Sequence, residues 1–516
     1  MANKALFATN RGPRVPKADT VNEAGGSAYD MTAEQALAQY CMTGCLSGTY
    51  YASAEQQLDK ILDLVGFCDV SYLAKLAILC REKGYMKDTP ALLCAILAGI
   101  DPMLLKRVFP RVIDNGRMLR NFVQIIRSGV VGRKSFGTAP KNLILNWLSS
   151  RTDDAVFRAS VGQSPSLADI IKMVHPKPST EQRRALYGYI IGKDYDAEQL
   201  PPLVQQFERF KRGRDAEQPD VPFQMLTSLD LGAVGWKEIA RHAKWQMTRM
   251  NLNTFKRHGV FDDRKLTNMI ADRLRDPENV RAARALPYQL LMAYKAASDV
   301  PVVVREALQD AMEIATENVP AFEGQVYVAV DVSGSMKWTP ITGHRSGATS
   351  AVRAVDVAAL FASCILRVNR TAVVLPFDTV VHSHDINPRD TVMTNADRLA
   401  RFGGGGTDCS QPLKHMNACQ DTGDLIIYVS DNQSWVCRGM MGTATQEQWS
   451  AFLHRNPTAK MVCIDVQPYG TVQVKTAPNV LNIGGFSDHV FSVIDMFSRG
   501  ELSGEHWARV VKSVDL

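Results

Sequence analysis

The pattern of hydrophobic residues changes completely near residue 320, and this change limits the chain to folds built from two parts of different class. From Thr32 to about Asn318 the sequence consists of short segments with helical periodicity, bounded by Pro, Gly, Asp or Ser. From residue 325 onward, β-branched apolar runs alternate with helical segments. The first pattern predicts an α solenoid of helix pairs, and the second predicts an α/β domain with a doubly wound parallel sheet.

Capping patterns predict where many helices of the first part begin. Thr32 and Gln35 form a capping box before a helix that Gly44 ends, and Asp101 followed by Pro102 opens another helix. Ser71 is predicted to cap a helix over residues 72–83. Because no strict repeat period is visible, irregular pairs of the HEAT type are favoured. Further helices are predicted to begin near Asp88, Ala139, Ser166, Ser179, Ala197, Trp236, Asp263, Pro287 and Val303.

The second part alternates between the two periodicities. The apolar runs predict buried parallel strands, and such sheets carry their sites at the carboxyl ends of the strands. The predicted strands cover residues 325–330, 372–376, 425–429, 461–466 and 480–483. The predicted helices cover residues 349–367, 411–418, 446–454 and 489–497.

The excess of positive charge is confined to the first part. Residues 1–320 contain 43 Lys and Arg against 35 Asp and Glu, whereas residues 321–516 contain 16 against 18. Residues 101–190 are the most basic stretch, with 15 Lys and Arg against 6 acids. Charge asymmetry of this kind indicates a polyanion-binding part joined to a part with another role.

A second basic cluster, within residues 241–260, contains no acid. Its cations are interleaved with two aromatic residues, Trp245 and Phe255, and with amides such as Asn251. Cations for phosphates, amides for base edges and aromatic rings for stacking form the mixture that single-stranded RNA recognition uses. The alternative is a solvated helix face whose aromatic residues belong to the core.

Several classes of protein are excluded by composition. No stretch approaches the ~18 uninterrupted apolar residues of a membrane span, and the N-terminus lacks the apolar run of a secretory signal. The ten cysteines include no C-x-x-C pair. A zinc site or disulfide framework is therefore not expected, and we expect a cytoplasmic protein whose cysteines are buried small hydrophobes.

Oxygen-bearing side chains follow the predicted strands of the second part. The first strand runs into a D-x-S-x-S motif, a run of four glycines leads into Thr407, and the strand over 425–429 ends at Ser430 and Asp431. Two carboxylates and three hydroxyls on adjoining loops form an all-oxygen site of the kind that Mg²⁺ prefers. The predicted metal ligands are Asp331, Ser333, Ser335, Thr407 and Asp431.

No catalytic constellation is visible in the sequence. The segment around Ser333 is not a G-x-S-x-G nucleophile elbow, and no G-x-x-x-x-G-K-[ST] phosphate loop is present. The chain is therefore predicted to bind its partners without acting as an enzyme.

The five predicted ligands match the metal-ion-dependent adhesion site of von Willebrand factor A (vWA) domains. The string G-G-T-D-C-S at 405–410 and five other strings narrow this resemblance: N-E-A-G-G at 22–26, G-T-Y-Y at 48–51, H-P-K-P-S at 175–179, L-P-Y at 286–288 and D-N-Q at 431–433. Together they resemble the Ro 60-kDa autoantigen family, the TROVE-domain proteins, from about residue 21 to residue 516.

The resemblance implies a ring of HEAT-like helix pairs closed by the A domain. It implies an N-terminal arm (1–20), a TROVE domain (21–320) and a vWA domain (321–516). Family members bind small noncoding Y RNAs on the outer basic surface, and single-stranded 3′ ends of misfolded or immature noncoding RNA enter the central hole. A bacterial member is implied, monomeric in a ribonucleoprotein, in which a Y-like RNA tethers an exoribonuclease, polynucleotide phosphorylase.

The resemblance also implies RNA-binding residues, and this sequence departs from the family at two of them. His175 aligns with a histidine implicated in Y RNA binding, but the basic helix before it retains only Arg158. Asn251 aligns with a family asparagine whose preceding arginine is here Met250. The predicted RNA-binding residues are Lys106, Arg107, Arg127, Arg133, Lys134, Lys141, Arg158, His175, Lys177, Arg249, Asn251 and Lys256. For His175 the alternative is a helix C-terminal residue that interacts with the last carbonyls.

Two other functions are compatible with an A domain. The first is a metal-dependent protein-adhesion scaffold, in which the open position of the ion takes a carboxylate from a partner such as a nuclease. The second is an A domain associated with a chelatase or ATPase, and the absence of an ATPase motif and the basic helical part count against it.

Overall fold

The computed structural model describes residues 15–43, 46–213, 217–283, 285, 287–341, 352–436, 439–440, 442–485, 489–502 and 506–516. Gly44, Leu286 and Thr349, which carried predictions, lie outside these residues. The chain divides into two compact units. Unit 1 combines Met1–Phe67, Arg275–Ser298 and Arg305–Val510, and unit 2 combines Cys68–Leu274, Asp299–Val304 and Val511–Leu516. The described residues before Cys68 therefore pack with residues from the later half of the chain.

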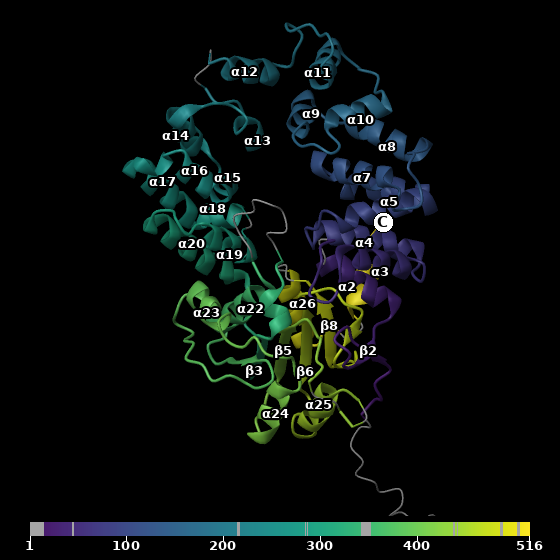
Figure 1. Ribbon diagram of the computed structural model, residues 1–516, viewed down its shortest axis with the longest axis vertical. Coiled ribbons are helices and arrows are strands. Elements are labelled where there is room, and N and C mark those ends of the chain that lie inside the picture. The colour runs from purple at the N-terminus through teal and green to yellow at the C-terminus, as the bar shows by residue number, and fades with distance from the viewer. Residues whose placement is uncertain are drawn as a thin grey trace, which may run out of the picture. The chain divides into compact units, whose positions relative to one another are not determined.

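Unit 2 is built from helices that follow one another closely along the chain (Figure 1). Between residues 32 and 318 the described residues contain no strand, as predicted. Helices close in sequence pack together, since α4 contacts α5 and α6, α5 contacts α7, and α10 contacts α11. The helices are α4 (Val70–Glu82), α5 (Thr89–Ile100), α6 (Pro102–Val112), α7 (Gly116–Ser128), α8 (Thr138–Ser149), α9 (Asp153–Ala159), α10 (Leu167–Val174), α11 (Glu181–Ile191), α12 (Pro202–Lys211), α13 (Phe223–Leu226), α14 (Gly232–His242), α15 (Trp245–Met250), α16 (Leu252–Arg257), η1 (Val260–Asp262) and α17 (Arg264–Arg275).

Side-chain caps explain about half of the helix starts in unit 2. The Asp101 carboxylate accepts hydrogen bonds from the backbone amides of Met103 and Leu104, both at 2.9 Å. The predicted cap at Ser71 is wrong, because Asp69 lies two residues earlier and its carboxylate accepts from the Ser71 amide at 2.8 Å. The start predicted near Ala197 is also wrong, since α12 begins only at Pro202, where a proline suits the first turn.

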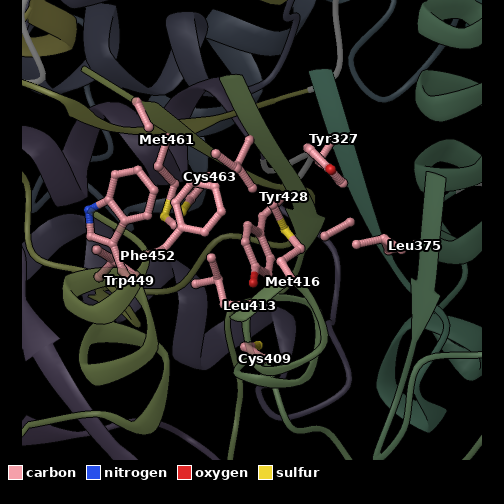
Figure 2. Close-up of a cluster of buried hydrophobic side chains, with 14 of the residues drawn as sticks. Tyr327, Leu375, Cys409, Leu413, Met416, Tyr428, Trp449, Phe452, Met461 and Cys463 are labelled. Atoms are coloured by element: carbon pink, nitrogen blue, oxygen red, sulfur yellow. The ribbon is translucent and has the colours of Figure 1, made fainter. Parts of the chain in front are cut away.

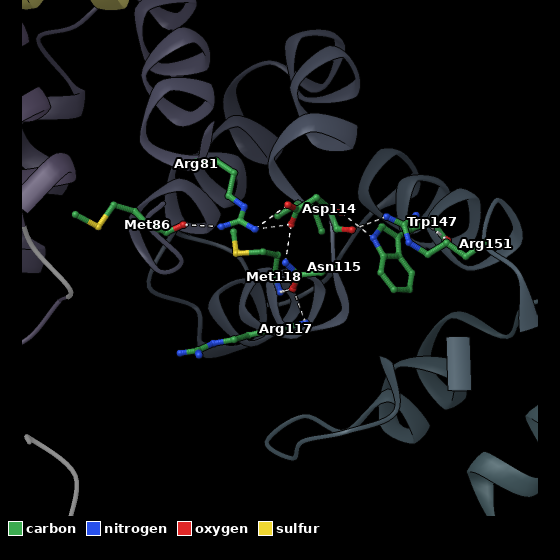
Figure 3. Close-up of polar contacts among 9 residues, drawn as sticks. Arg81, Met86, Asp114, Asn115, Arg117, Met118, Trp147 and Arg151 are labelled. Carbon is green, nitrogen blue, oxygen red and sulfur yellow. Dashed lines mark hydrogen bonds and ion pairs between the residues drawn. The ribbon is translucent and has the colours of Figure 1, made fainter. Parts of the chain in front are cut away.

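One loop ties three helices of unit 2 together (Figure 3). Arg81 of α4 donates to both oxygens of Asp114, at 3.0 and 2.7 Å, in the loop between α6 and α7. Trp147 of α8 donates to the Ile113 carbonyl at 2.7 Å, and Arg151, just after the end of α8, donates to the Asp114 carbonyl at 2.9 Å. Because charged hydrogen bonds of this kind join successive helices, part of the basic stretch stabilises the fold.

Unit 1 is organised around a parallel five-stranded sheet, with strand order β4-β3-β5-β6-β8. The predicted α/β doubly wound domain is thus observed, with strand bounds within one or two residues of those predicted. The strands are β3 (Val326–Asp331), β4 (Val373–Phe377), β5 (Leu425–Ser430), β6 (Lys460–Asp465) and β8 (Val480–Gly484). A separate antiparallel sheet joins β1 (Thr20–Val21), β2 (Ser27–Asp30) and β7 (Thr471–Val472).

Helices cover the parallel sheet. Helix α22 contacts β3, β4 and β5, while α24 contacts β4 and packs on α25. Two further helices, α20 (Val302–Ala315) and α27 (His506–Lys512), contain residues of both units. The remaining helices of unit 1 are α2 (Ala33–Thr43), α3 (Ala54–Val65), α18 (Pro277–Ala282), α19 (Pro287–Ala296), η2 (Thr316–Asn318), α21 (Gly334–Trp338), α22 (Ala354–Val368), α23 (Val392–Leu399), α24 (Gln411–Ala418), α25 (Ala444–Arg455) and α26 (His489–Ser498).

The core between the sheet and α24–α25 follows from strand periodicity (Figure 2). Alternate residues of a strand point to the same face of the sheet. Tyr428 of β5 and Cys463 of β6 therefore lie in one buried cluster with Ile426 and Met461, two residues earlier on the same strands. Leu413 of α24 is fully buried there, and Trp449 stacks on Phe452 of α25 with ring centroids 5.9 Å apart. This packing holds the sheet and the loops at its carboxyl edge in place.

Two predictions about the whole chain can be compared with the described residues. Among them, no helix is both long and apolar enough to cross a membrane. The cysteines behave as buried small hydrophobes at six positions, as predicted: Cys41, Cys80, Cys94, Cys364, Cys409 and Cys463.

Substitution of Leu413 by alanine is expected to lower the free energy of unfolding by about 2–5 kcal/mol, because it leaves a cavity in a fully buried cluster. The control is Val373→Ala on β4, where the side chain is 38% exposed and the loss is expected to be less than half as large. Urea unfolding followed by tryptophan fluorescence measures both. Equal losses in the two variants would contradict the assignment of Leu413 to the core.

Candidate functional site

The candidate metal site is built on the carboxyl end of β3, the second strand of the sheet. Asp331 is the last residue of β3 and is fully buried. One of its carboxylate oxygens accepts from the backbone amide of Ser333 at 2.9 Å, and the other accepts from the Ser430 hydroxyl at 2.6 Å. Since Ser430 ends the neighbouring strand β5, these bonds fix the carboxylate between two loops at the same edge of the sheet.

The two serines of the motif lie at the start of the short helix α21. Ser333 is its N-cap residue and Ser335 lies in its first turn, which brings their hydroxyl oxygens to 3.2 Å from each other. Both side chains are at most 3% exposed. The motif spacing therefore places two hydroxyls beside the Asp331 carboxylate, as predicted.

The glycine run packs against this turn. The Gly404 amide donates to the Val332 carbonyl at 2.8 Å, and the Gly334 amide donates to the Gly405 carbonyl at 2.9 Å. At Gly403 the backbone has a φ of +67°, and a Cβ there would lie 2.4 Å from the Val332 carbonyl oxygen. Only glycine tolerates this approach, which carries the chain to Thr407, a residue with a side chain 1% exposed.

Asp431 follows β5 and is also fully buried. One of its carboxylate oxygens accepts from the Gln433 amide at 3.1 Å, and the other accepts from the Gln467 side chain at 3.2 Å. Gln467 follows β6, so three adjacent parallel strands contribute to the site. Gln467 was not predicted as a site residue, although its position just after a strand end could have indicated it.

Burial raises the cost of ionising both carboxyl groups. Burial is the main cause that raises the pKa of Asp331 to about 6, while the hydroxyls of Ser333 and Ser430 act in the opposite direction. Burial again, followed by the charge of Asp331, raises the pKa of Asp431 to about 7, and the Ser335 hydroxyl lowers it. Two buried carboxylates this close together favour a bound cation, because a cation offsets both costs.

The donor set fits a hard divalent cation. Among the described residues no group of three or more His, Cys, Asp or Glu is arranged to hold a metal, so a site here depends on hydroxyl oxygens as well as on the two carboxylates. Ser335 interacts with Asp431, and Asp331 interacts with Ser333, so these four predicted ligands form one connected cluster. The backbone of Thr407 attaches the glycine run to the loop after Asp431, because its carbonyl accepts from the Trp435 amide at 3.1 Å. Carboxylate and hydroxyl oxygens without thiolate or imidazole suit Mg²⁺.

The predicted RNA-binding residues differ in their exposure. Half-buried side chains are Arg133, Lys141, Arg158 and Asn251. Arg249 is 9% exposed, and burial lowers the pKa of its guanidinium to about 10. The exposed side chains, which have the best access to a polyanion, are Lys106, Arg107, Arg127, Lys134, His175, Lys177 and Lys256.

Several of the arginines hold the protein's own backbone. Arg133 donates to the carbonyls of Ala98 at 2.6 Å and Ser135 at 2.9 Å, which fixes the loop before α8. Arg158 pairs with Asp220 at 3.0 Å. Exposed lysines are therefore better candidates for phosphate contacts than these two arginines.

The second basic cluster departs from its sequence interpretation. Trp245 is 4% exposed and Phe255 is fully buried, and the Trp245 ring nitrogen donates to the Leu274 carbonyl at 3.0 Å. Both rings therefore lie in the core, as the alternative interpretation of this cluster predicted, and are not available to stack on bases. The Asn251 amide donates to the Met247 carbonyl at 2.8 Å, while Lys256 is exposed.

His175 is the C-cap residue of α10. Its backbone is left-handed, with a φ of 52°, and its amide donates to the Ile171 carbonyl at 3.0 Å. The imidazole is exposed. The backbone of His175 thus binds one of the last carbonyls of the helix, as the alternative interpretation predicted, while the side chain stays accessible to a ligand.

Comparisons with known proteins agree with this architecture. Residues 325–498 match the family described as the Ro60 vWA domain. The chain is 24% identical to the RNA-binding protein RO60 of Deinococcus radiodurans, over 95% of this chain and 97% of that protein. It also resembles the crystal structure of the Deinococcus radiodurans RO (RSR) protein, with a TM-score of 0.65 and 20% identity, over 91% of this chain and all of the other. The predicted fold class, helical repeats plus a vWA domain, is confirmed.

The raised pKa values predict that the metal-free protein loses stability as the pH rises. Asp331 and Asp431 bind protons more tightly in the folded chain, so their contribution is complete below about pH 4 and is lost as the pH passes about 6 and 7. Asp431→Asn is expected to flatten this dependence in EDTA, whereas Asp385→Asn, at an exposed position, leaves it unchanged. Thermal unfolding between pH 4 and 8 measures it, and identical slopes for both variants would contradict the assignment.

Proposed function

We propose that this chain is a member of the Ro60 family and an RNA-binding protein whose helical part holds the RNA. The observation that carries this proposal is the similarity, over nearly the whole chain, to a protein named for RNA binding. The exposed cations of unit 2, among them Lys106, Lys134 and Lys177, support it, because phosphate contacts supply most of the affinity for RNA.

Within this function we propose two kinds of RNA contact. A Y-like RNA would bind on the outer basic surface, and a single-stranded 3′ end of misfolded or immature noncoding RNA would enter the central hole that the family resemblance implies. Selection then needs no sequence code, because a duplex is too wide for an opening that admits a free single strand. A Y-like RNA could also tether an exoribonuclease such as polynucleotide phosphorylase, so that RNA captured by this protein is degraded or processed.

We also propose that unit 1 binds Mg²⁺ at the carboxyl edge of its sheet. Asp331, Ser333, Ser335, Thr407 and Asp431 would hold it, and the ion would supply positive charge that offsets the two buried carboxylates. Because Ser430 and Gln467 hold the carboxylates in place, the role of the ion is to stabilise this edge. The chain acts in this proposal by binding, without catalysis.

Removal of exposed lysines is expected to weaken RNA binding and to reduce its dependence on salt. For the triple variant Lys106→Gln, Lys134→Gln and Lys177→Gln, the slope of log affinity against log salt should fall by roughly one per lost phosphate contact. The control is Arg401→Gln, which removes an exposed cation from unit 1. Filter binding between low and moderate salt measures the slope, and equal slopes for the two variants would contradict this location.

The steric part of the proposal has a separate test. A structured RNA with a single-stranded 3′ tail is expected to bind at least tenfold more tightly than the same RNA with a blunt duplex end. Competition binding with the full chain compares the two. Equal affinities would contradict selection by a free end, while leaving binding to exposed cations intact.

The variant Asp331→Asn tests the metal proposal independently of RNA binding. This variant is expected to lose the thermal stabilisation that Mg²⁺ gives the unsubstituted protein, because a neutral amide attracts the ion less, and to keep its affinity for RNA. Calorimetry in the presence of Mg²⁺ and RNA binding in parallel measure both properties. Loss of RNA affinity in a folded variant would instead tie the site directly to the RNA.

A further inference from the structure

The candidate metal site is covered by a segment from the beginning of the chain, residues 49–52. In an adhesion domain, one coordination position of the ion stays open for a carboxylate from a partner protein. We propose that Tyr51 closes this position here, so that its phenol oxygen takes the place of the partner's carboxylate. This inference rests on the proposed Mg²⁺ site. All the residues involved belong to unit 1.

A single glutamine links this segment to the site. The Tyr50 amide donates to the Gln467 side-chain oxygen at 3.2 Å, and the side-chain nitrogen of Gln467 donates to the Asp431 carboxylate at 3.2 Å. The adjacent Tyr51 amide donates to the Tyr469 hydroxyl at 3.3 Å, with the two rings 6.1 Å apart and edge to face. Two successive backbone amides, those of Tyr50 and Tyr51, therefore attach this segment to the loop that follows β6.

The Tyr51 ring points from this anchor toward the predicted ligands. Its hydroxyl has the Ser335 hydroxyl as a hydrogen-bonding neighbour, and it senses the charges of Asp431 and Asp331. A neutral phenol oxygen is a hard donor like the serine hydroxyls beside it, so it suits the same cation.

A second part of the N-terminal region packs on the loop after Asp431. The Asn22 side chain donates to the Ser434 carbonyl at 2.7 Å, and the Glu23 amide donates to the Gln433 side chain at 2.9 Å. At Gly26 a Cβ would lie 2.0 Å from the Ser434 carbonyl oxygen, so the two backbones touch. Figure 1 shows the neighbouring strand β2, in purple, beside the yellow-green strands of this unit.

These contacts explain why the site is inaccessible. All five predicted ligands are at most 3% exposed. A carboxylate of another protein can reach an ion held by them only if residues 49–52 move away. The neighbouring Tyr50, in contrast, is 51% exposed and faces solvent, so the two tyrosines of the G-T-Y-Y string have different roles.

The inference is tested by titrating Mg²⁺ into the full chain, previously stripped with EDTA, with and without acetate as a free carboxylate. The unsubstituted protein is expected to bind Mg²⁺ with an affinity that acetate does not change. Tyr51→Ala is expected to bind Mg²⁺ about tenfold more weakly, the size of effect typical for groups that support a metal site, and acetate should restore part of the loss. Tyr50→Phe is the matched control and should behave as the unsubstituted protein.

Hydrogen exchange supplies a readout that does not depend on affinity. Mg²⁺ is expected to slow amide exchange of residues 49–52 in the unsubstituted protein, but not in Tyr51→Phe, which keeps the ring and removes only the hydroxyl. If acetate raised the affinity of the unsubstituted protein, or if Tyr51→Phe matched it in both measurements, Tyr51 would not close the site. Failure of the unsubstituted protein to bind Mg²⁺ would overturn the metal proposal itself and this inference with it.

Discussion

Two carboxylates buried side by side at the ends of adjacent parallel strands are the constraint on which unit 1 depends. Asp331 and Asp431 are both inaccessible to water, and each carries a raised pKa whose main cause is burial. An uncompensated pair of this kind is expensive, so the surrounding chain must supply donors. The hydroxyl of Ser430, the amide of Gln467 and the backbone amides after each strand do so. A cation at the same place offsets what remains of the cost.

The same constraint explains why the beginning of the chain packs with its later half. The sheet edge consists of polar loops, and residues 22–26 and 49–52 attach to it by backbone hydrogen bonds as well as side chains. Gln39 of α2 adds a hydrogen bond of 2.6 Å to the buried Asp465, whose pKa burial raises well above its usual value. A unit assembled from both ends of the chain keeps water away from three buried carboxyl groups.

Much of this could be predicted from local sequence, and the rest depends on contacts between distant residues. The β-branched runs and the D-x-S-x-S motif predicted the strands and four connected ligands, because strand ends in a parallel sheet share one edge. The contact between the segment at Tyr50 and Tyr51 and the loop at Gln467 could not be predicted, since more than 400 residues separate Tyr50 from Gln467 and no periodicity indicates such a pairing. For Trp245 and Phe255 the sequence left two interpretations open, because an aromatic residue beside cations looks the same in sequence whether it stacks on a base or fills a core; the structure shows the core.

Net charge therefore overstates the surface that is available to RNA. Arg81 and Arg151 join helices through the loop at Asp114, and Arg133 holds carbonyls of the loop before α8. Arginine suits such work because its planar group donates several hydrogen bonds at once. Lysine offers a single flexible charge, and lysines such as Lys106 and Lys134 stay exposed. In the basic part of the chain, several arginines therefore bind carbonyls and carboxylates of the protein itself, whereas lysines such as Lys106 and Lys134 keep their charge at the surface. The excess of positive charge thus contributes both to the stability of the fold and to the binding of a polyanion.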